Sequence, residues 1–282
     1  MQDVLLVTPE WFNIVDEKNI HMKGHAGTTN QSKAKEQWNA LKNVYEILRQ
    51  KGLIGHVHIL KGTPHCEDMV FAANQSLPFI SAQGKKTVIL SRMKHASRQR
   101  EIPAFEEFYH TLGYEIITPP EGIVLEGMGD ILPVPFTDRW IAGYGHRTSP
   151  EAVDWLKKVL PGTITPVELV SDYFYHLDTC LIPVNAHTAL FCPLAFSSEG
   201  IKLLQKNFSQ LIEIPVHEAK SGFALNAHLV QNALGQKAAI LQQGNTYTER
   251  IFTELGCEIY PLDTSEYIKS GGSVFCMKMM LP

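Results

Sequence analysis

The sequence predicts an α/β fold made of five repeats of one small unit. A helix, a short turn, a strand and a proline follow one another five times along the 282 residues, and an apolar strand precedes each helix. The repeats are roughly 45 to 60 residues long, and periods in that range are typical of closed rings or arrays of supersecondary units. Five βαβ-like modules closing in a ring fit this pattern, and an open, doubly wound sheet is the alternative.

The first repeat shows the pattern most clearly. Residues 4–7 are apolar and predict a buried strand, and the polar stretch 11–29 has no periodicity and predicts a long loop. Long loops inside compact domains are often functional. Apolar residues then recur at helical spacing and predict a helix over 31–51, which Gly52 ends. Residues 56–60 alternate as a strand should.

The other four repeats follow the same order. We predict apolar strands over 87–90, 140–142, 188–191 and 238–241, helices over 105–112, 155–160, 203–211 and 250–255, and closing strands over 113–117, near Pro166, over 212–214 and over 257–260. No Gly-rich fingerprint follows the first strand, and no P-loop is present. The sequence therefore predicts no nucleotide cofactor.

The overall composition is that of an ordinary globular protein. Hydrophobic residues make up 44% and charged residues 19% of the chain, and the formal net charge is −4. No block of basic residues is present, so the charge argues against nucleic-acid binding or a membrane-surface role.

The cysteines indicate the compartment. They are five in number, scattered and without CxxC spacing, which favours a reducing compartment over a disulfide framework or a zinc site. We expect no bound metal. The N-terminal stretch is too short for a signal peptide and has no basic start, and no apolar run approaches the length of a membrane span. The expected location is the cytoplasm.

The C-terminal stretch 270–277 is apolar and carries a thiol. A Gly271-Gly272 pair, which permits a tight turn and a close approach of backbone to ligand, precedes Cys276. A lone cysteine is most often a small buried hydrophobe. The alternative is that Cys276 is a nucleophile, which requires a histidine and an acid elsewhere in the chain.

Two segments carry the histidine and acid candidates. His176 and Asp178 follow an aromatic run, and alternation in a strand would place both side chains on one face. Glu126 and Asp130 lie in the Gly-rich segment Leu-Glu-Gly-Met-Gly-Asp. A histidine serves as acid or base near neutral pH, and a buried Glu126 would orient it. A solvated strand end and an ordinary acidic turn are the alternatives.

Further polar residues are candidates for substrate binding. Asp68 and Asn74 lie six apart in a segment predicted to be extended, which places them on the same face. Arg98 and Arg147 lie in predicted loops and have the geometry for bidentate capture of a carboxylate. Most arginines in loops are solvated instead.

Taken together, these motifs resemble the guanidine-modifying enzymes. The set is Glu126-Gly-x-Gly-Asp130, His176-Leu-Asp178 and Gly271-Gly272-x-x-x-Cys276-Met277, and the resemblance runs from Val4 to Met280. Arginine deiminases, dimethylarginine dimethylaminohydrolases and amidinotransferases belong to this group. The resemblance implies the pentein fold, a five-bladed ββαβ propeller with pseudo-fivefold symmetry, as a single catalytic domain over 1–282.

The resemblance also implies a role for each candidate. Cys276 corresponds to the nucleophile that attacks the guanidinium carbon, His176 to the general acid and base, and Glu126 to the acid that hydrogen-bonds this histidine. Asp178 corresponds to the carboxylate that grips guanidinium nitrogens. Arg98 and Arg147 correspond to arginines that bind the carboxylate of the amino acid. Asp68 corresponds to a substrate-contacting acid of the dimethylarginine enzymes.

Asn74 departs from the deiminase pattern, which has an aspartate at this point to clamp the guanidinium. Asn is neutral and offers both a donor and an acceptor, so a citrulline-like ureido group can stay bound for a second hydrolysis. In having an asparagine at this position, the sequence resembles the arginine dihydrolase domains, which convert arginine to ornithine, carbon dioxide and ammonia. Asn19 corresponds to a substrate-contacting asparagine in their N-terminal loop.

The leading interpretation is therefore a metal-free, cysteine-dependent hydrolase of arginine or a related guanidino compound. A deiminase or dimethylarginine-type hydrolase is the main alternative, and an amidinotransferase would need an acceptor amine that nothing here identifies. A guanidino-binding protein without turnover is the non-enzymatic alternative. A conventional cysteine protease is disfavoured because its expected surroundings for the cysteine are absent. Family members are commonly homo-oligomers, and the sequence leaves this point open.

Overall fold

The computed structural model describes residues 2–282, which form two compact units. Unit 1 consists of the chain up to Ala72 together with Ile214–Pro282, and unit 2 is Ala73–Glu213. No helix among residues 2–282 is both long and apolar enough to cross a membrane.

All five sheets of the two units share one plan. Each sheet has three strands, and its middle strand pairs antiparallel with the strand before it in the repeat. A helical segment follows the middle strand, and the next strand pairs parallel to the middle one. The predicted fivefold repeat is confirmed, and the five predicted apolar strands are the middle strands. The first strand of each sheet was missing from the prediction.

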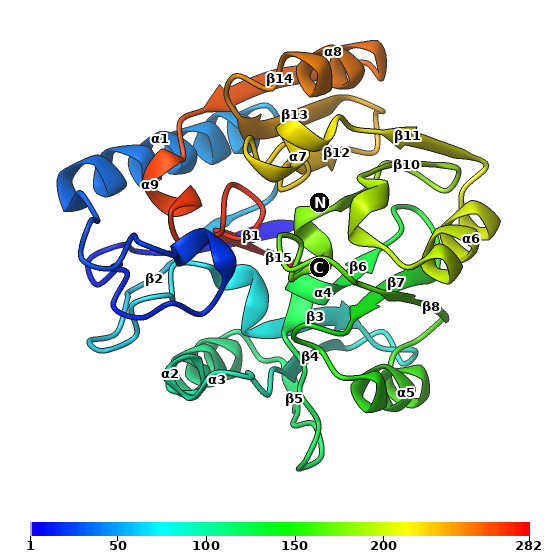
Figure 1. Cartoon of the computed structure of the whole chain (residues 1–282). Helices are drawn as coiled ribbons and strands as arrows, with labels where there is room; N and C mark the ends of the chain where they lie inside the picture. The colour runs from blue at the N-terminus through cyan, green and yellow to red at the C-terminus, as the bar shows by residue number, and fades with distance from the viewer. Residues whose placement is uncertain (1) are drawn as a thin grey trace. The chain divides into compact units, whose positions relative to one another are not determined.

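Unit 1 contains two sheets, and one of them joins the two ends of the chain. Their strands are β15 (Lys278–Leu281), β1 (Asp3–Val7) and β2 (Val57–Leu60) in one sheet, and β12 (His228–Gln231), β13 (Lys237–Gln242) and β14 (Cys257–Leu262) in the other. Val4 lies opposite Met280 in the antiparallel β1–β15 pair (Figure 1). The last strand of the sequence therefore supplies the missing first strand of the first repeat.

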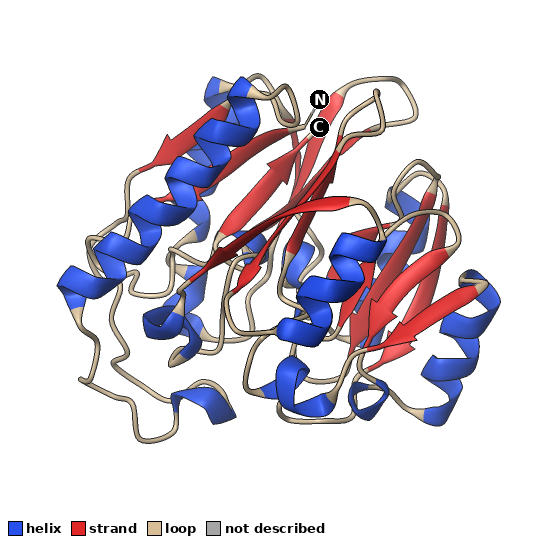
Figure 2. Ribbon diagram, turned by 90° about the horizontal axis from the view of Figure 1, so that it is seen from above, coloured by secondary structure: helices blue, strands red, loops and turns tan. Residues whose placement is uncertain are grey.

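A long helix, α1 (Gln31–Gln50), packs against the core of unit 1 (Figure 2). The Asn30 side chain caps its start by accepting a hydrogen bond from the amide of Lys33. Gly52 ends it in a left-handed conformation with φ of 69°, and the amide of Leu53 returns to the carbonyl of Leu48, as in a Schellman cap. The apolar face of α1 is buried, and its buried residues include Trp38, Leu41, Tyr45 and Leu48.

The other helical segments of unit 1 are short. They are η1 (Ile20–Met22), α7 (Val216–Lys220), α8 (Thr246–Glu254) and α9 (Ser265–Ile268). The predicted helix over 250–255 begins earlier, at Thr246, because the Glu218 carboxylate accepts hydrogen bonds from the amides of Tyr247 and Thr248 at 2.8 and 2.9 Å. This cap comes from α7, which is distant in sequence.

Unit 2 contains three sheets of the same plan. They are β3 (Ser76–Ile80), β4 (Lys86–Leu90) and β5 (Glu115–Ile117); β6 (Ile131–Pro133), β7 (Arg139–Tyr144) and β8 (Thr163–Glu168); and β9 (Leu181–Pro183), β10 (Thr188–Phe191) and β11 (Gln210–Glu213). The middle strands β4, β7 and β10 are the apolar strands of the prediction.

The helical segments of unit 2 are η2 (Ala72–Asn74), which begins on the last residue of unit 1, α2 (Ala96–Gln99), α3 (Ile102–Thr111), α4 (Gly127–Asp130), α5 (Pro150–Val159), η3 (Leu177–Thr179), η4 (Pro193–Ala195) and α6 (Ser198–Asn207). Two of them, α5 and α6, begin at serine caps that lie before the predicted helices over 155–160 and 203–211, and α6 ends at Asn207, before the predicted end. The Ser149 and Ser197 side chains accept from the amides of Ala152 and Gly200. Serine at the N-cap satisfies an amide that the helix itself leaves open.

Two local predictions are wrong. Asp178 is not on the face of a strand with His176, because Leu177–Thr179 forms the 3-10 helix η3 and the Thr179 hydroxyl donates to the carbonyl of His176 at 2.6 Å. The segment from Asp68 to Asn74 is not extended either: it consists of turns and η2, and its ends belong to different units.

Candidate functional site

Cys276 lies in a turn just before β15, and its side chain is 2% exposed. The glycine pair upstream is required by the local geometry. Gly271 has a φ of +86°, and a Cβ on Gly272 would lie 2.4 Å from the Phe71 ring. The predicted tight turn is confirmed, and the thiol belongs to this turn and not to the strand that follows.

A polar cluster in unit 1 ties the N-terminal loop to the start of the same C-terminal segment. Lys18 pairs with Asp68 at 3.0 Å, and the Ser270 hydroxyl donates to Asp68 at 3.2 Å. The Asn19 amide donates to the carbonyl of Ser270 at 3.0 Å, while its oxygen caps η1. Burial would lower the pKa of Lys18, but Asp68 and Asp16 together raise it. Lys18 therefore keeps its charge in the cluster.

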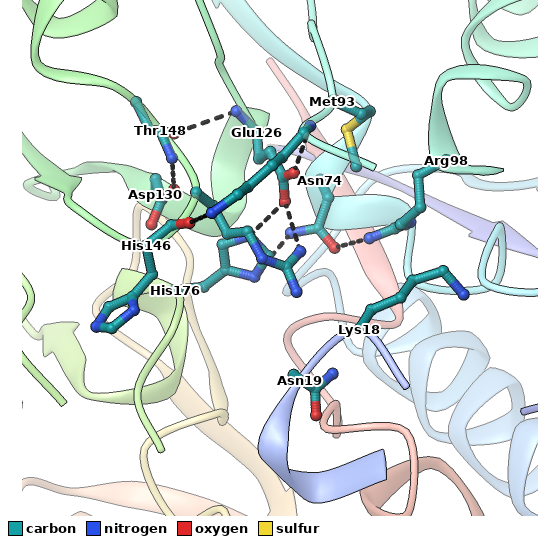
Figure 3. A network of polar contacts seen from close by, with 12 residues as sticks. Lys18, Asn19, Asn74, Met93, Arg98, Glu126, Asp130, His146, Thr148 and His176 are labelled. Atoms are coloured by element: carbon teal, nitrogen blue, oxygen red, sulfur yellow. Dashed lines mark hydrogen bonds and ion pairs between the residues drawn. The ribbon is translucent and has the colours of Figure 1, made fainter. Parts of the chain in front are cut away.

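In unit 2, the Glu126 carboxylate lies 2.7 Å from Nε2 of His176 (Figure 3). Both side chains are buried, at 0% and 1% exposure. At the other ring nitrogen, the Asn74 amide nitrogen lies 3.5 Å from Nδ1. A neutral imidazole that donates from Nε2 to the carboxylate leaves Nδ1 as an acceptor, so Nδ1 is the nitrogen available for proton exchange.

The Glu126 carboxylate is held in its charged form. Burial raises its pKa, but the Arg147 guanidinium, the hydrogen bond and charge of His176, and the charge of Arg98 together lower that pKa well below its usual range. Arg147 lies 3.1 Å from Glu126 and its guanidinium sits 4.7 Å from the centre of the Tyr175 ring. A permanent carboxylate at this position favours the protonated imidazole when it forms.

Asn74 is also fixed from its oxygen side. Its Oδ1 accepts from Nη1 of Arg98 at 2.8 Å (Figure 3), and Arg98 pairs with Glu101 at 3.1 Å. All three side chains are buried. Because arginine can only donate, the Asn74 oxygen faces Arg98 and its amino group faces His176.

The two glycines of the Glu-Gly-Met-Gly-Asp segment permit this packing. A Cβ on Gly127 would lie 2.3 Å from the carbonyl of Ser76, and the residue has a φ of +49°. A Cβ on Gly129 would lie 2.2 Å from the Asn74 amide nitrogen and 3.4 Å from the His176 ring. Any larger residue at either position would displace its neighbour.

Asp130 closes the same segment and binds two backbone amides. Its carboxylate accepts from Leu177 and Thr148, each at 3.1 Å, and so holds the residues next to His176 and Arg147. Burial raises the pKa of Asp130, with a further rise from the charge of Glu126, against the lowering effects of His176 and the hydrogen bonds.

The structure thus gathers the predicted residues within each unit. Unit 2 brings together Asn74, Arg98, Glu126, Arg147 and His176, with Asp178 buried in η3. Unit 1 holds Cys276 and, in the cluster described above, Asn19 and Asp68. Arg98 and Arg147 are paired with carboxylates and are not solvated, and their predicted role in binding a substrate carboxylate stays a prediction.

Several polar partners were not predicted. Lys18 lies in a loop without periodicity, and Asn226, which contacts Cys276, lies 50 residues before it; neither position carries a local signal. Glu101 did carry a local signal, because an acid three residues after Arg98 at the start of a helical pattern predicts an ion pair. No group of three or more metal-binding side chains occurs within the described range 2–282.

Comparison with known proteins identifies the class. A solved structure of an N-terminal-domain variant of ArgZ, covalently bonded to a reaction intermediate, superposes with a TM-score of 0.90 at 25% identity and covers 100% of this chain and 98% of that one. ArgZ is described as an arginine dihydrolase from the ornithine–ammonia cycle in cyanobacteria. The chain thus has the pentein fold of the guanidine-modifying superfamily, as predicted.

A family model and two relatives place the chain more narrowly within this superfamily. The chain belongs to the family described as "N,N dimethylarginine dimethylhydrolase, eukaryotic", which matches residues 9–281. The bifunctional arginine dihydrolase/ornithine cyclodeaminase AgrE of Nostoc sp. is 30% identical over 277 residues, covering 98% of this chain and 37% of AgrE. The N(G),N(G)-dimethylarginine dimethylaminohydrolase of Mycobacterium tuberculosis is 31% identical over 243 residues, covering 86% of this chain and 74% of that enzyme. The chain thus spans little more than a third of the length of AgrE.

Proposed function

We propose that this protein is an arginine dihydrolase, a cysteine-dependent hydrolase that converts arginine to ornithine, carbon dioxide and two ammonia molecules. The observation that carries the proposal is the position of Asn74, a neutral amide held between Arg98 and His176. A carboxylate there would favour a cationic guanidinium over a neutral ureido group, whereas an amide can bind both. The similarity to AgrE and ArgZ supports the same substrate.

The proposed mechanism uses Cys276, His176 and Glu126. The thiolate of Cys276 attacks the guanidinium carbon, His176 protonates the departing ammonia, and a covalent amidino intermediate forms on sulfur. His176 then takes a proton from water, which attacks the same carbon and releases citrulline with return of the thiolate. Glu126 holds the imidazole and stabilises its charged form through the 2.7 Å hydrogen bond.

The second hydrolysis repeats these roles on the ureido group. Cys276 attacks the ureido carbon, a second ammonia leaves with a proton from His176, and a carbamoyl thioester remains. Water then releases the thiolate and a carbamate, which breaks down to ornithine and carbon dioxide. Two waters are consumed for each arginine, and the atoms balance without any cofactor.

The proposal assigns residues 1–282 to one catalytic domain that binds a small guanidino substrate. The family match over 9–281 supports this, since it includes parts of both units. Asp178, Arg98, Arg147, Asp68 and Asn19 are the proposed substrate-binding residues. The five cysteines are free thiols, which supports the predicted cytoplasmic location.

The family name and the Mycobacterium relative favour a second candidate, hydrolysis of dimethylarginine. In that case Asp68 would contact the substrate. The buried Lys18–Asp68 ion pair argues against a free negative charge at this position.

Product analysis tests the proposal. The purified protein is incubated with arginine or dimethylarginine, and ammonia, dimethylamine, citrulline and ornithine are quantified. We expect about two ammonia per arginine and ornithine as the end product. Citrulline as the sole end product would contradict the dihydrolase step, and preferred release of dimethylamine would support the second candidate. Absence of turnover, with arginine protecting Cys276 from iodoacetamide, would indicate a binding protein.

A further inference from the structure

The Asn226 side chain is bound to the turn that carries Cys276. Asn226 lies between α7 and β12 and has no exposed surface. Its Oδ1 accepts from the amides of Ser273 and Cys276 at 2.9 and 3.2 Å, and its own carbonyl accepts from the amide of Phe275 at 2.9 Å. One residue thus holds three backbone amides of a four-residue segment.

The other end of the same amide faces the thiol. Nδ2 of Asn226 lies 3.1 Å from Sγ of Cys276 and donates to it. The orientation of the amide is determined by its surroundings, because a flipped side chain would place its amino group against two backbone N–H donors. The sulfur therefore faces a donor and not an oxygen.

A donor at this distance favours one ionisation state of the sulfur. A neutral thiol is a weak acceptor, whereas a thiolate is a strong one, so the hydrogen bond stabilises the charged form more. Such a donor matters at this position because Cys276 packs in the apolar core of unit 1 with Val274 and Met277. Burial in apolar surroundings disfavours a thiolate.

We propose that Asn226 is a positioning residue that fixes Cys276 for attack and favours its thiolate through the Nδ2–Sγ hydrogen bond. The inference rests on the proposed function, in which Cys276 is the nucleophile. The thiolate is the reactive species, so the amide acts on the first step of both hydrolyses.

Two variants separate the Nδ2 donor, which faces the sulfur, from the Oδ1 acceptor, which holds the backbone amides of the turn. Asn226→Asp keeps an acceptor for the backbone amides, removes the donor and adds a negative charge beside the sulfur. Asn226→Leu has a similar size, removes both functions and adds no charge. We expect the midpoint of the pH dependence of Cys276 alkylation to rise by about one pH unit or more in Asn226→Asp, with a smaller rise in Asn226→Leu.

The measurement is the rate of iodoacetamide labelling of the Cys276 peptide between pH 6 and 10, followed by mass spectrometry. Burial raises the pKa of Cys180, Cys192 and Cys257, so these thiols stay protonated over most of the range. A Cys276→Ser protein provides the background. Thermal unfolding of each variant shows whether it is folded.

Asn245→Asp is the matched control. Asn245 is also a buried asparagine of unit 1, 2% exposed, and its Nδ2 donates to the carbonyls of Gly222 and Gln242. Its substitution removes buried donors without touching Cys276, so we expect the alkylation midpoint to stay within about 0.2 pH units of the wild type.

The outcomes distinguish this inference from the proposed function. An unchanged midpoint in a folded Asn226→Asp protein would overturn the inference, as would an equal shift in Asn245→Asp. If only Asn226→Leu folds, an unchanged midpoint in that variant has the same meaning. A shifted midpoint in a protein that does not consume arginine would contradict the function alone, and an unshifted one in an active dihydrolase would contradict this inference alone.

Discussion

Oε2 of Glu126 lies 2.7 Å from Nε2 of His176 and 3.1 Å from Nη1 of Arg147. One buried carboxylate oxygen thus serves a histidine and an arginine at once. The arginine keeps the carboxylate charged, and the charged carboxylate keeps the imidazole in one tautomer and one orientation.

Glu126→Gln should therefore reduce turnover without unfolding the protein. Glutamine has the same shape, but it removes the charge that stabilises the imidazolium, and we expect kcat to fall about 100-fold with arginine. Steady-state ammonia release measures the effect. Glu121→Gln is the control, because Glu121 is exposed in the same repeat. Equal activity of Glu126→Gln and wild type would contradict the role of Glu126.

Asn74→Asp should change the product and not only the rate. The aspartate keeps the oxygen that accepts from Arg98 and replaces the amino group facing His176 by a carboxylate oxygen. A carboxylate favours a cationic guanidinium over a neutral ureido group, so citrulline should accumulate and ammonia per arginine should fall from about two to about one.

Asn185→Asp is the control for this change. The Asn185 oxygen accepts from the amides of His187 and Thr188, and an aspartate preserves this acceptor. The control should keep the ammonia ratio of the wild type. A ratio of about two in Asn74→Asp would contradict the role of Asn74, and a ratio of about one in both the wild type and the variant would favour a deiminase over a dihydrolase.

Gly129→Ala should displace the Asn74 amide. The added Cβ would lie 2.2 Å from Nδ2 of Asn74, and a shift of about 1 Å in a reacting group can reduce kcat about 100-fold. Gly200→Ala is the control, since its Cβ would meet nothing closer than 3.4 Å. That position is inside α6, where alanine should raise stability by up to about 1 kcal/mol. Kinetics and chemical denaturation of both variants measure the difference.

Lys18→Met should destabilise unit 1 by leaving the Asp68 carboxylate buried without this cation. The Lys18 and Asp68 side chains are each 4% exposed, and breaking a buried pair costs about 3 kcal/mol or more. Lys33→Met is the control, because its ion pair with Asp263 is 43% and 34% exposed and should be worth less than about 1 kcal/mol. Urea denaturation measures both, and Lys18→Met with Asp68→Asn should recover part of the loss.

His228 should make stability depend on pH. Burial lowers its pKa well below the usual value, with a further lowering from Lys278, and Nδ1 lies 2.9 Å from the Tyr45 hydroxyl. The unfolded chain therefore binds a proton below about pH 6.5 that the folded protein does not, so stability is present above this pH and lost as the pH falls.

His228→Gln should remove this contribution. Between pH 6.5 and 5.5, wild type should lose up to about 1.4 kcal/mol more than the variant, as measured by denaturation at each pH. His187→Gln is the control, because this histidine is exposed, and it should behave like wild type. Parallel losses in wild type and His228→Gln would mean that His228 titrates alike in both states.

The repeat and most of the candidate site residues can be predicted from the sequence alone. The middle strand, helix and closing strand of each repeat are continuous in sequence, so their apolar periodicity reports them directly. The Glu126, His176 and Cys276 motifs are short and local. The glycines at 127, 129 and 272 stand where a side chain would clash, and Gly271 has a positive φ.

Contacts between residues that lie far apart in the chain are visible only in the folded structure. Four such contacts each join residues 29 to 278 positions apart: the β1–β15 pairing, the Glu218 cap of α8, the Lys18–Asp68 ion pair and the Asn226–Cys276 contact. Such contacts depend on how the modules pack, and no periodicity of 2 or 3.6 residues encodes them. The motif in the sequence points to Cys276, but the amide that faces its sulfur is visible only in the folded chain.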